Sequence, residues 1–322
     1  MKVLVTGATG FIGFNLILNL LKFNQYQIDG VDNLNSYYDI KLKKDRLTIL
    51  EGSKKRFKFY KLNICNKKKI NNLFKKNNYD IVVHLAAQAG VRYSLIDPKT
   101  YLKNNIDGFY NIIENSKNFK IKNFIYASTS SVYGNSKKFP LKEEYNTNNP
   151  ESFYAATKKN NEIIASSYSS LYDIKTIGLR FFTVYGPFGR PDMAHYKFTN
   201  AIINKKSILL FNNGNHYRDF TYIDDVTTMI SKIISNVNKI KPKINIFNIG
   251  SGETVSLMKL ISLLEREIGK KALLEFVEMQ KGDVYKTHSN IDNISEIIKF
   301  KPKININEGV KLYLKWFLKY YS

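Results

Sequence analysis

Two side chains, Tyr154 and Lys158, have the types and spacing needed to move a proton. On a helix, residues i and i+4 lie on one face about 6 Å apart. An ammonium beside a phenol stabilises the phenolate and lowers the tyrosine pKa from about 10 towards neutrality. Such a tyrosine can act as general base and general acid. The spacing alone is common, since Tyr313 also lies near Lys315, so the pair needs supporting context.

A run of hydroxyl side chains before this pair supplies part of that context. Residues 127–134 read ASTSSVYG and overlap the end of an apolar run at 124–128. The apolar run is predicted as a buried strand. Hydroxyls at its end could contact a sugar hydroxyl beside the tyrosine, so the pattern favours chemistry at a sugar carbon.

A glycine-rich segment at the N-terminus has the features of a dinucleotide site. Gly7, Gly10 and Gly13 follow a predicted strand and open a predicted helix with the spacing GxxGxxG. The first permits a tight turn, the second lets the backbone approach a pyrophosphate, and the third lets helix and strand pack closely. The N–H groups and positive end of the helix can then bind phosphate. A strand–turn–helix without a ligand is the alternative.

The residues after the next strands indicate which dinucleotide would bind. Asp32 follows the glycines by about 20 residues, where a carboxylate accepts from ribose hydroxyls and repels a 2′-phosphate. The next residue, Asn33, is not an arginine, so NAD is favoured over NADP. A turn role is the alternative for Asp32. Asn63 and Ile64 follow the third predicted strand and are placed to contact adenine. Small side chains that permit close approach of the cofactor follow the fourth, in the segment Leu85, Ala86, Ala87 and Gln88.

The predicted strands and helices that must position these groups alternate along the chain. Apolar runs at 2–6, 27–31, 57–60, 81–85, 124–128 and 175–180 are predicted as buried strands. Helical spacing occurs near 12–23, 38–50, 67–76, 99–117 and 152–172. Strands alternating with helices predict an α/β fold with a Rossmann, doubly wound parallel sheet. Ligands of such sheets bind outside the carboxyl ends of the strands.

The pattern changes after residue 180. Proline and glycine cluster at 185–191, and shorter elements follow up to a predicted terminal helix near 307–320. We expect residues 1–180 to form an NAD-binding domain to which later segments contribute. Residues 181–322 should mainly form a smaller C-terminal lobe that binds the substrate, with the site in the cleft between.

The composition of the chain limits the classes of partner that it is expected to bind. The chain has 322 residues, 43% of them hydrophobic, and one cysteine, Cys65, which excludes a disulfide framework and fits the cytoplasm. No run of about 18 apolar residues is present, so no membrane partner is expected. The net charge of +23 comes from scattered lysines without a recognition motif, so no nucleic-acid partner is expected. A positive field still favours encounter with an anionic nucleotide. No metal site is expected.

Taken in order, the glycine turn, the ribose acid, the hydroxyl run and the YxxxK pair resemble extended short-chain dehydrogenases/reductases. The chain is similar to NAD-dependent nucleotide-sugar epimerases from residue 1 to near its end. The segments most similar to UDP-glucuronate 4-epimerases are 32–39, 87–94, 180–194, 217–225 and 279–283. This resemblance implies a UDP-sugar substrate and a homodimer in which helices 99–117 and 152–172 pair across a two-fold axis.

The resemblance also implies roles for single residues. Tyr154 and Lys158 would do the proton work, Thr129 and Ser130 would assist at the sugar, and Asn105 would orient the active-site helix. The implied cofactor-binding set adds Thr9, Phe11, Ile12 and Asn105, and it also includes Tyr154 and Lys158. The implied substrate-binding set is Arg92, Ser94, Thr129, Ser130, Thr183, Arg190, Phe211, Arg218 and Asp283.

Four of the substrate residues carry specific expectations. Arg190 would pair with a uronate carboxylate, Arg218 would bind the diphosphate, Phe211 would lie near uracil, and Asp283 would accept from the uridine ribose. Each has a structural alternative. Arg190 could be a surface arginine, Phe211 a core residue, and Arg218 the partner of Asp219 in a local ion pair.

The activity implied is reversible NAD-dependent 4-epimerisation of UDP-glucuronate to UDP-galacturonate through a 4-keto intermediate. Ser131 stands where related decarboxylases tend to carry an acid, which disfavours decarboxylation, and Asn63 replaces an expected aspartate. Two alternatives remain. One is a 4-epimerase of UDP-glucose or UDP-N-acetylglucosamine, and the other is a non-catalytic NAD-binding regulatory protein.

Overall fold

The computed structural model describes residues 1–53, 55–241, 244–280 and 282–321. Within these ranges, seven strands form one parallel sheet in the order β11-β6-β5-β4-β1-β2-β3. The strands are β1 (Lys2–Thr6), β2 (Gln27–Asp32), β3 (Phe57–Lys61), β4 (Ile81–His84), β5 (Asn123–Thr129), β6 (Lys175–Phe181) and β11 (Ile244–Ile249). The predicted Rossmann α/β fold is confirmed.

The strand order reverses at the centre of the sheet. The chain runs outward from β1 to β3, then crosses back to β4 and continues outward on the other side. Thr6 at the end of β1 pairs with His84 at the end of β4. A crevice opens at such a switch point, outside the carboxyl ends of the strands. The glycine turn after β1 and the segment after β4 therefore meet there.

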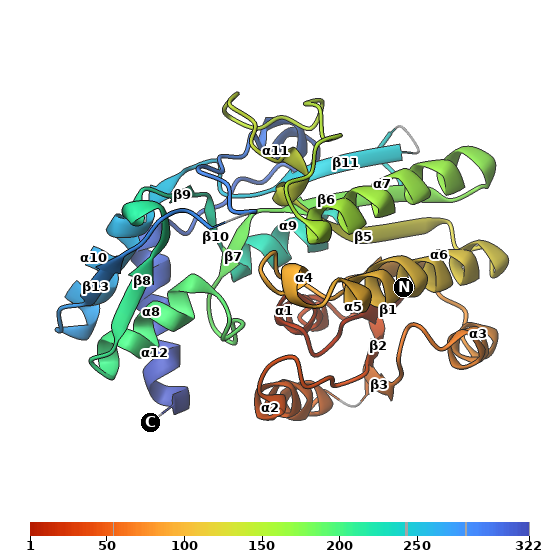
Figure 1. Cartoon of the computed structure of the whole chain (residues 1–322). Helices are drawn as coiled ribbons and strands as arrows, with labels where there is room; N and C mark the ends of the chain where they lie inside the picture. The colour runs from red at the N-terminus through yellow and green to blue at the C-terminus, as the bar shows by residue number, and fades with distance from the viewer. Residues whose placement is uncertain (54, 242–243, 281, 322) are drawn as a thin grey trace.

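Helices cover both faces of the sheet (Figure 1). Val3 and Val5 of β1 belong to one core cluster and Leu4 to another, because successive strand residues point to opposite faces. Both clusters are buried, as expected for a parallel sheet. The first cluster includes α1 (Phe11–Leu21), α2 (Ile40–Glu51) and α9 (Ile223–Ser235). The second includes α3 (Lys67–Lys76), α6 (Gly108–Asn118) and α7 (Phe153–Leu171).

The helical run predicted at 99–117 is present, but it is not one regular α-helix. A short helix α4 (Tyr93–Ile96) comes first, α5 (Pro98–Tyr101) leads into a π-helix at Leu102–Asp107, and α6 follows. The widened turn contains Asn105, whose side chain bonds to a loop and to α7 instead of to its own helix. Such π-helical turns are frequent at functional sites.

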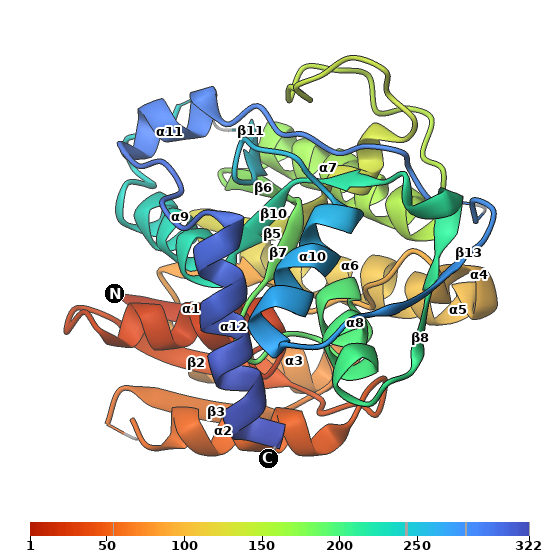
Figure 2. The same ribbon diagram turned by 90° about the vertical axis from the view of Figure 1, so that its left-hand side faces the viewer.

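A smaller lobe is built from the chain after β6. In the part of the chain that the structure describes, it contains three short two-stranded pairs and the long C-terminal helix, which lies beside α10 and reaches α2 (Figure 2). Its strands are β7 (Thr183–Tyr185), β8 (Ser207–Leu210), β9 (Tyr217–Arg218), β10 (Phe220–Tyr222), β12 (Val255–Ser256) and β13 (Leu273–Phe276). Its helices are α8 (Ala194–Ile203), α10 (Leu257–Ile268), α11 (Asp292–Ile298) and α12 (Ile306–Tyr321).

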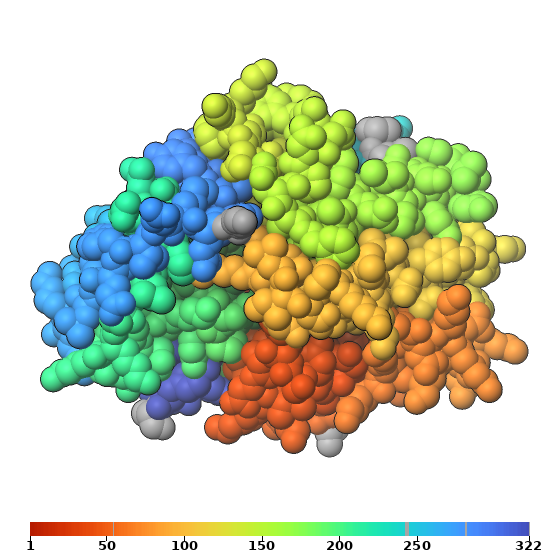
Figure 3. All heavy atoms as spheres, in the orientation of Figure 1, coloured from red at the N-terminus to blue at the C-terminus, as the bar shows by residue number. Residues whose placement is uncertain are grey.

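The strand β11 was not predicted from the sequence. It lies after residue 180 but joins the large sheet beside β6, so the chain returns to the sheet after building part of the lobe. In the space-filling view the C-terminal segments meet the orange segments near residue 90 along a hollowed seam (Figure 3). No helix in the described ranges is long and apolar enough to span a bilayer.

Candidate active site

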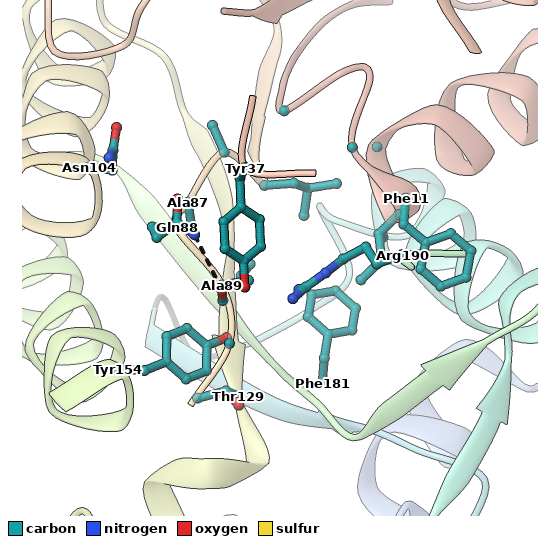
Figure 4. A pocket seen from close by; sticks show the side chains of 18 of the residues that line it. Phe11, Tyr37, Ala87, Gln88, Ala89, Asn104, Thr129, Tyr154, Phe181 and Arg190 are labelled. Carbon is teal, nitrogen blue, oxygen red and sulfur yellow. Dashed lines mark hydrogen bonds between the residues drawn. The ribbon is translucent and has the colours of Figure 1, made fainter. Parts of the chain in front are cut away.

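A cavity of about 410 Å³ lies at the carboxyl ends of the central strands (Figure 4). It gathers most of the residues predicted to bind the cofactor and the sugar. The cofactor set is represented in its lining by Gly7, Gly10, Phe11, Ile12, Gly13, Asp32, Asn33, Ile64, Leu85, Ala86, Ala87 and Gln88. The catalytic and sugar sets are represented by Thr129, Ser130, Tyr154, Lys158, Thr183 and Arg190.

The glycine turn leaves no room for side chains. A Cβ at Gly13 would stand 2.1 Å from the Gly7 carbonyl oxygen, and one at Gly7 would stand 2.8 Å from the Ala86 nitrogen. Within the described chain, no side chain caps α1 and no acidic residue lies in its first turn. Its N-terminal N–H groups are thus free to bind phosphate oxygens. These residues fit a dinucleotide pyrophosphate.

The carboxylate of Asp32 supports two backbone segments while lining the cavity. It accepts from the Thr9 nitrogen at 3.1 Å and from the Leu34 nitrogen at 2.9 Å. The turn role and the ribose role are therefore compatible. Lys43, which sequence reasoning missed, also lines the cavity and donates to the Asn35 carbonyl at 2.8 Å. Burial lowers the pKa of Lys43 and the nearby Asp32 charge opposes this.

Three residues of the predicted cofactor set lie just outside the cavity lining. Thr9 is fully buried in the glycine turn. The side-chain oxygen of Asn63 accepts from the Cys65 nitrogen at 2.8 Å, so it shapes the turn after β3, while Leu62 and Ile64 line the cavity. The contact of Asn63 with adenine stays a prediction.

The third of these residues, Asn105, joins the loop after β4 to the active-site helix. Its side-chain oxygen accepts from the Gln88 nitrogen at 2.8 Å, and its amide donates to the Gln88 carbonyl and the Thr157 hydroxyl, both at 3.0 Å. Asn161 donates to the Asn105 carbonyl at 2.6 Å. This network fixes α7, which carries Tyr154, against the loop.

Tyr154 and Arg190 project into the cavity from opposite sides (Figure 4). Burial raises the pKa of Tyr154 overall, and a hydrogen bond with Thr129 and the charge of Arg190 oppose this rise. Lys158 donates to the Ala127 carbonyl at 2.8 Å, and burial lowers the pKa of Lys158 to about 8. The groups that lower the tyrosine pKa here are Thr129 and Arg190, while the Lys158 ammonium bonds to the backbone. The predicted effect of Lys158 on the tyrosine pKa stays a prediction.

A buried ion pair beneath the catalytic helix was not foreseen. Arg180 on β6 donates to both carboxylate oxygens of Glu162 on α7, at 2.8 and 2.9 Å, and Ser128 donates to the same carboxylate at 2.6 Å. Burial acts to raise the pKa of Glu162, but the hydrogen bonds and charge of Arg180 lower it overall. The pair therefore fixes α7 to the sheet in its ionised form.

Replacing Glu162 with glutamine should destabilise the protein by about 3–5 kcal/mol, because the Arg180 charge stays buried without its partner. The free energy of unfolding, measured in urea, checks this. Asp173→Asn is the control, since it removes the carboxylate of an exposed pair with Lys122, and it should cost less than about 1 kcal/mol. A depressed carboxyl pKa adds stability that is lost in acid. The Glu162→Gln difference should therefore shrink below about pH 4. Equal costs at neutral pH would contradict the role of the buried pair.

Four residues of the predicted substrate-binding set come together from three distant segments. The Arg92 guanidinium lies 4.5 Å from the centre of the Phe211 ring and 3.2 Å from the Asp283 carboxylate. Burial lowers the pKa of Arg218 to about 10, and the nearby Asp283 charge opposes this. These four residues form a basic cluster outside the main cavity lining.

The structure decides between the alternatives for three of these residues. Arg190 lines the cavity and its side chain is 19% exposed, so it is not a surface arginine. Phe211 is half-buried beneath Arg92 instead of belonging to the core. Arg218 donates to the Tyr217 and Tyr285 carbonyls, while the carboxylate of Asp219 accepts from other groups, so the local ion pair is wrong.

Two further observations concern the sugar end of the cavity. Ser94 is buried and its hydroxyl donates to the Val91 carbonyl at 2.6 Å, so it supports the loop instead of lining the cavity. Arg190 is held by Asp192, with contacts of 2.9 and 2.5 Å, and Tyr37 donates to the same carboxylate at 3.2 Å. Tyr37 and Asp192 were missed, although both lie in segments that carried the resemblance.

Comparison with known proteins places these features in a family. Residues 3–250 match the model of the NAD dependent epimerase/dehydratase family. The protein CapI of Staphylococcus aureus is 44% identical over 336 residues, with both chains fully covered. The UDP-glucuronate 4-epimerase of Thermodesulfobacterium geofontis is 41% identical, with 97% of this chain and 95% of that protein covered.

Solved structures agree with this placement. UDP-glucuronic acid 4-epimerase from Bacillus cereus, in complex with UDP-glucuronic acid and NAD, matches with a TM-score of 0.92 at 34% identity over the whole of both chains. UDP-glucose 4-epimerase from Thermotoga maritima, with UDP-glucose, matches with a TM-score of 0.89 at 30% identity, also over both whole chains. The predictions of an NAD-dependent enzyme and of an epimerase-type isomerase are thereby confirmed. The chain belongs to the NAD dependent epimerase/dehydratase family, the extended short-chain dehydrogenase/reductase group that its sequence resembles.

Proposed function

We propose that this protein is a UDP-glucuronate 4-epimerase, which interconverts UDP-glucuronate and UDP-galacturonate through a 4-keto intermediate. The observation that carries the proposal is the presence of Arg190 in the same cavity as Tyr154. A guanidinium there can bind a sugar carboxylate in two-point fashion. The relatives named as UDP-glucuronate 4-epimerases support the choice of sugar.

In this proposal Tyr154 moves the proton and the chain holds the sugar. Tyr154 as phenolate accepts the proton of the sugar 4-hydroxyl and returns it after the sugar has turned its other face. Thr129 stabilises the phenolate by a hydrogen bond, and Arg190 by its charge. Bound NAD, held by the glycine turn and Asp32, supplies the oxidation by taking a hydride from C4 and giving it back.

The uronate makes one further demand on the site. The 4-keto intermediate is a β-keto acid, which can lose its carboxylate as CO₂. Arg190 and Thr183, which both line the cavity, are the residues proposed to hold the carboxylate out of the geometry for that loss. Ser131 also lines the cavity, and a serine supplies no acid/base group for a later decarboxylation step.

One observation favours a second candidate, a 4-epimerase of a neutral UDP-sugar such as UDP-glucose. Two nitrogens on one edge of the Arg190 guanidinium, Nε and Nη2, already donate to the Asp192 carboxylate, so its charge is balanced within the protein. A neutral sugar would leave that pair undisturbed. The similarity to the UDP-glucose 4-epimerase of Thermotoga maritima is consistent with this candidate.

Incubation of the purified protein with UDP-glucuronate, without added NAD, tests the proposal. Reversible appearance of UDP-galacturonate supports it, since a regenerated cofactor stays bound through each cycle. A UDP-pentose product would mean decarboxylation. Conversion of UDP-glucose or UDP-N-acetylglucosamine alone would select the second candidate, and a protein loaded with NAD that converts no UDP-sugar would be a binding protein.

We also propose a homodimer. Apolar side chains are exposed on the π-helix, α6 and α7, at Leu102 (50%), Tyr110 (42%) and Ile163 (58%). Pairing of these helices with those of a second copy would cover them as a four-helix interface. Ile163→Asp should convert the dimer to a monomer by light scattering, whereas Leu273→Asp, an equally exposed apolar position on β13, should not. A wild-type monomer would contradict the proposal.

A further inference from the structure

Arg46, on α2, is a fully buried arginine. Its Nη1 donates to the Thr9 carbonyl and to the Tyr38 hydroxyl, both at 2.7 Å. Its Nη2 donates to the Phe188 carbonyl at 2.6 Å and reaches the Gly189 carbonyl at 3.5 Å. Within the described ranges, these partners are all neutral oxygens. Burial of a charge without a carboxylate is costly, so an apolar side chain would be expected if packing were its only task.

The two segments joined by Arg46 belong to the two halves of the site. Thr9 lies in the glycine turn that would hold the pyrophosphate, and its nitrogen donates to Asp32. Phe188 and Gly189 directly precede Arg190, which lines the sugar end of the cavity. One side chain from α2 thus links the cofactor turn to the loop that presents Arg190, across separations of 37 and 142 residues.

The loop before Arg190 needs such support. Phe188 has φ +57°, a left-handed conformation that costs a non-glycine residue roughly 1–2 kcal/mol. Its ring is fixed by Phe14 of α1 at 5.0 Å and by Trp316 and Tyr320 of α12 at 5.1 and 5.7 Å, between ring centres. The ring is therefore held by helices, while the backbone carbonyl is held by Arg46.

We infer that Arg46 is a positioning residue, which sets where Arg190 stands relative to the cofactor turn through the Phe188–Gly189 segment. This inference rests on the proposed function, because it assigns Arg46 an effect on the uronate carboxylate. Arg46 acts on that carboxylate only through Arg190. Its loss should weaken binding of a uronate far more than binding of a neutral UDP-sugar.

The test uses Arg46→Lys, which keeps the charge but loses the second arm of the guanidinium. The expected result is a rise of about fivefold or more in KM for UDP-glucuronate, with the inhibition constant of UDP-glucose within about twofold of wild type. In an Arg190→Ala background the further effect of Arg46→Lys should vanish, because residues that act through each other are not additive. Bound NAD and the melting temperature are measured on every variant.

Arg56→Lys is the matched control. Its guanidinium also bonds to two backbone carbonyls, those of Phe23 at 2.8 Å and Leu21 at 2.7 Å, but these lie at the far end of α1. It should leave both constants unchanged. A second variant, Gly189→Ala, changes the loop itself, since the added methyl would lie 2.9 Å from His195 Nε2. It should displace the loop while the Arg46 side chain itself stays unaltered, and it should give the same selective rise in KM.

The outcomes separate this inference from the proposed function. If the wild type does not use UDP-glucuronate, the proposed function fails. If the wild type uses it and Arg46→Lys keeps the wild-type KM, weakens both ligands equally, or adds fully to Arg190→Ala, the inference fails alone. If Arg46→Lys does not fold, Gly189→Ala decides. An unchanged KM in that variant would show that the position of this loop does not control the uronate.

Discussion

Replacing Tyr154 with phenylalanine should lower kcat for UDP-sugar epimerisation by about 10³-fold, within the range that positioned acid–base groups contribute. The change removes one hydroxyl from a half-buried ring that lines the cavity and leaves the glycine turn and Asp32 intact. Bound NAD and the melting temperature should therefore stay near wild type. Initial rates with UDP-glucuronate, together with the NAD released on acid denaturation, provide the measurement.

Tyr133→Phe is the matched control for this change. The Tyr133 hydroxyl is also buried and donates to Asn248 at 2.7 Å, but it does not line the cavity. Its loss should cost about 1 kcal/mol of stability with little effect on kcat. If Tyr154→Phe and Tyr133→Phe slowed turnover equally, Tyr154 would not be the proton-transfer group.

The pH profile tests the same role without removing the tyrosine. The hydrogen bond from Thr129 lowers the pKa of Tyr154, so Thr129→Val should raise that pKa. A base works in its deprotonated form, so the pH at which kcat reaches half of its maximum should move to higher values. An unchanged profile with a lower maximum would mean that Thr129 contacts the sugar but does not tune the tyrosine.

The sequence predicted the sheet well because its strands are buried on both faces. Residues 3–5, for example, are a continuous apolar run, and the structure places each of the six predicted strands in the parallel sheet. The seventh strand, β11, was missed because it follows the lobe in the chain, where the regular alternation has stopped. The π-helical turn was also missed, since it accompanies a tertiary contact of Asn105 with Gln88 that no local pattern reports.

The site was predictable to the extent that its residues stand in local motifs. For the glycine turn, Asp32 and the Tyr154–Lys158 pair, the spacing in the sequence is enough to predict where the residues lie in the fold. By contrast, Arg46 and Glu162 act through partners that are distant in the sequence, such as Phe188 for Arg46. No spacing rule connects such pairs. For the same reason the pKa of Tyr154 could not be derived from Lys158 alone, because Arg190 approaches from another segment.

Replacing Arg190 with alanine should lower kcat/KM for UDP-glucuronate by about 10²-fold, which corresponds to roughly 2.7 kcal/mol lost from hydrogen bonds to a charged group. The inhibition constant of UDP-glucose should change by less than about threefold, since UDP-glucose has no sugar carboxylate that could bind Arg190. The fraction of UDP-pentose by-product should rise, because the carboxylate of the 4-keto intermediate is no longer restrained. The charge of Arg190 also lowers the pKa of Tyr154, so the pH for half-maximal kcat should rise.

The substitution Asp192→Asn tests Arg190 in the opposite direction, because it should strengthen the binding of the uronate. It leaves the Arg190 guanidinium in the cavity but removes the carboxylate that balances its charge. If Arg190 binds the uronate, UDP-glucuronate should then bind more tightly than to wild type, while UDP-glucose should bind as before. The contrary result is that Arg190→Ala weakens the binding of both nucleotide sugars equally and Asp192→Asn does not tighten the binding of UDP-glucuronate. In that case the Arg190–Asp192 pair would only support the loop. The neutral UDP-sugar would then be the better assignment.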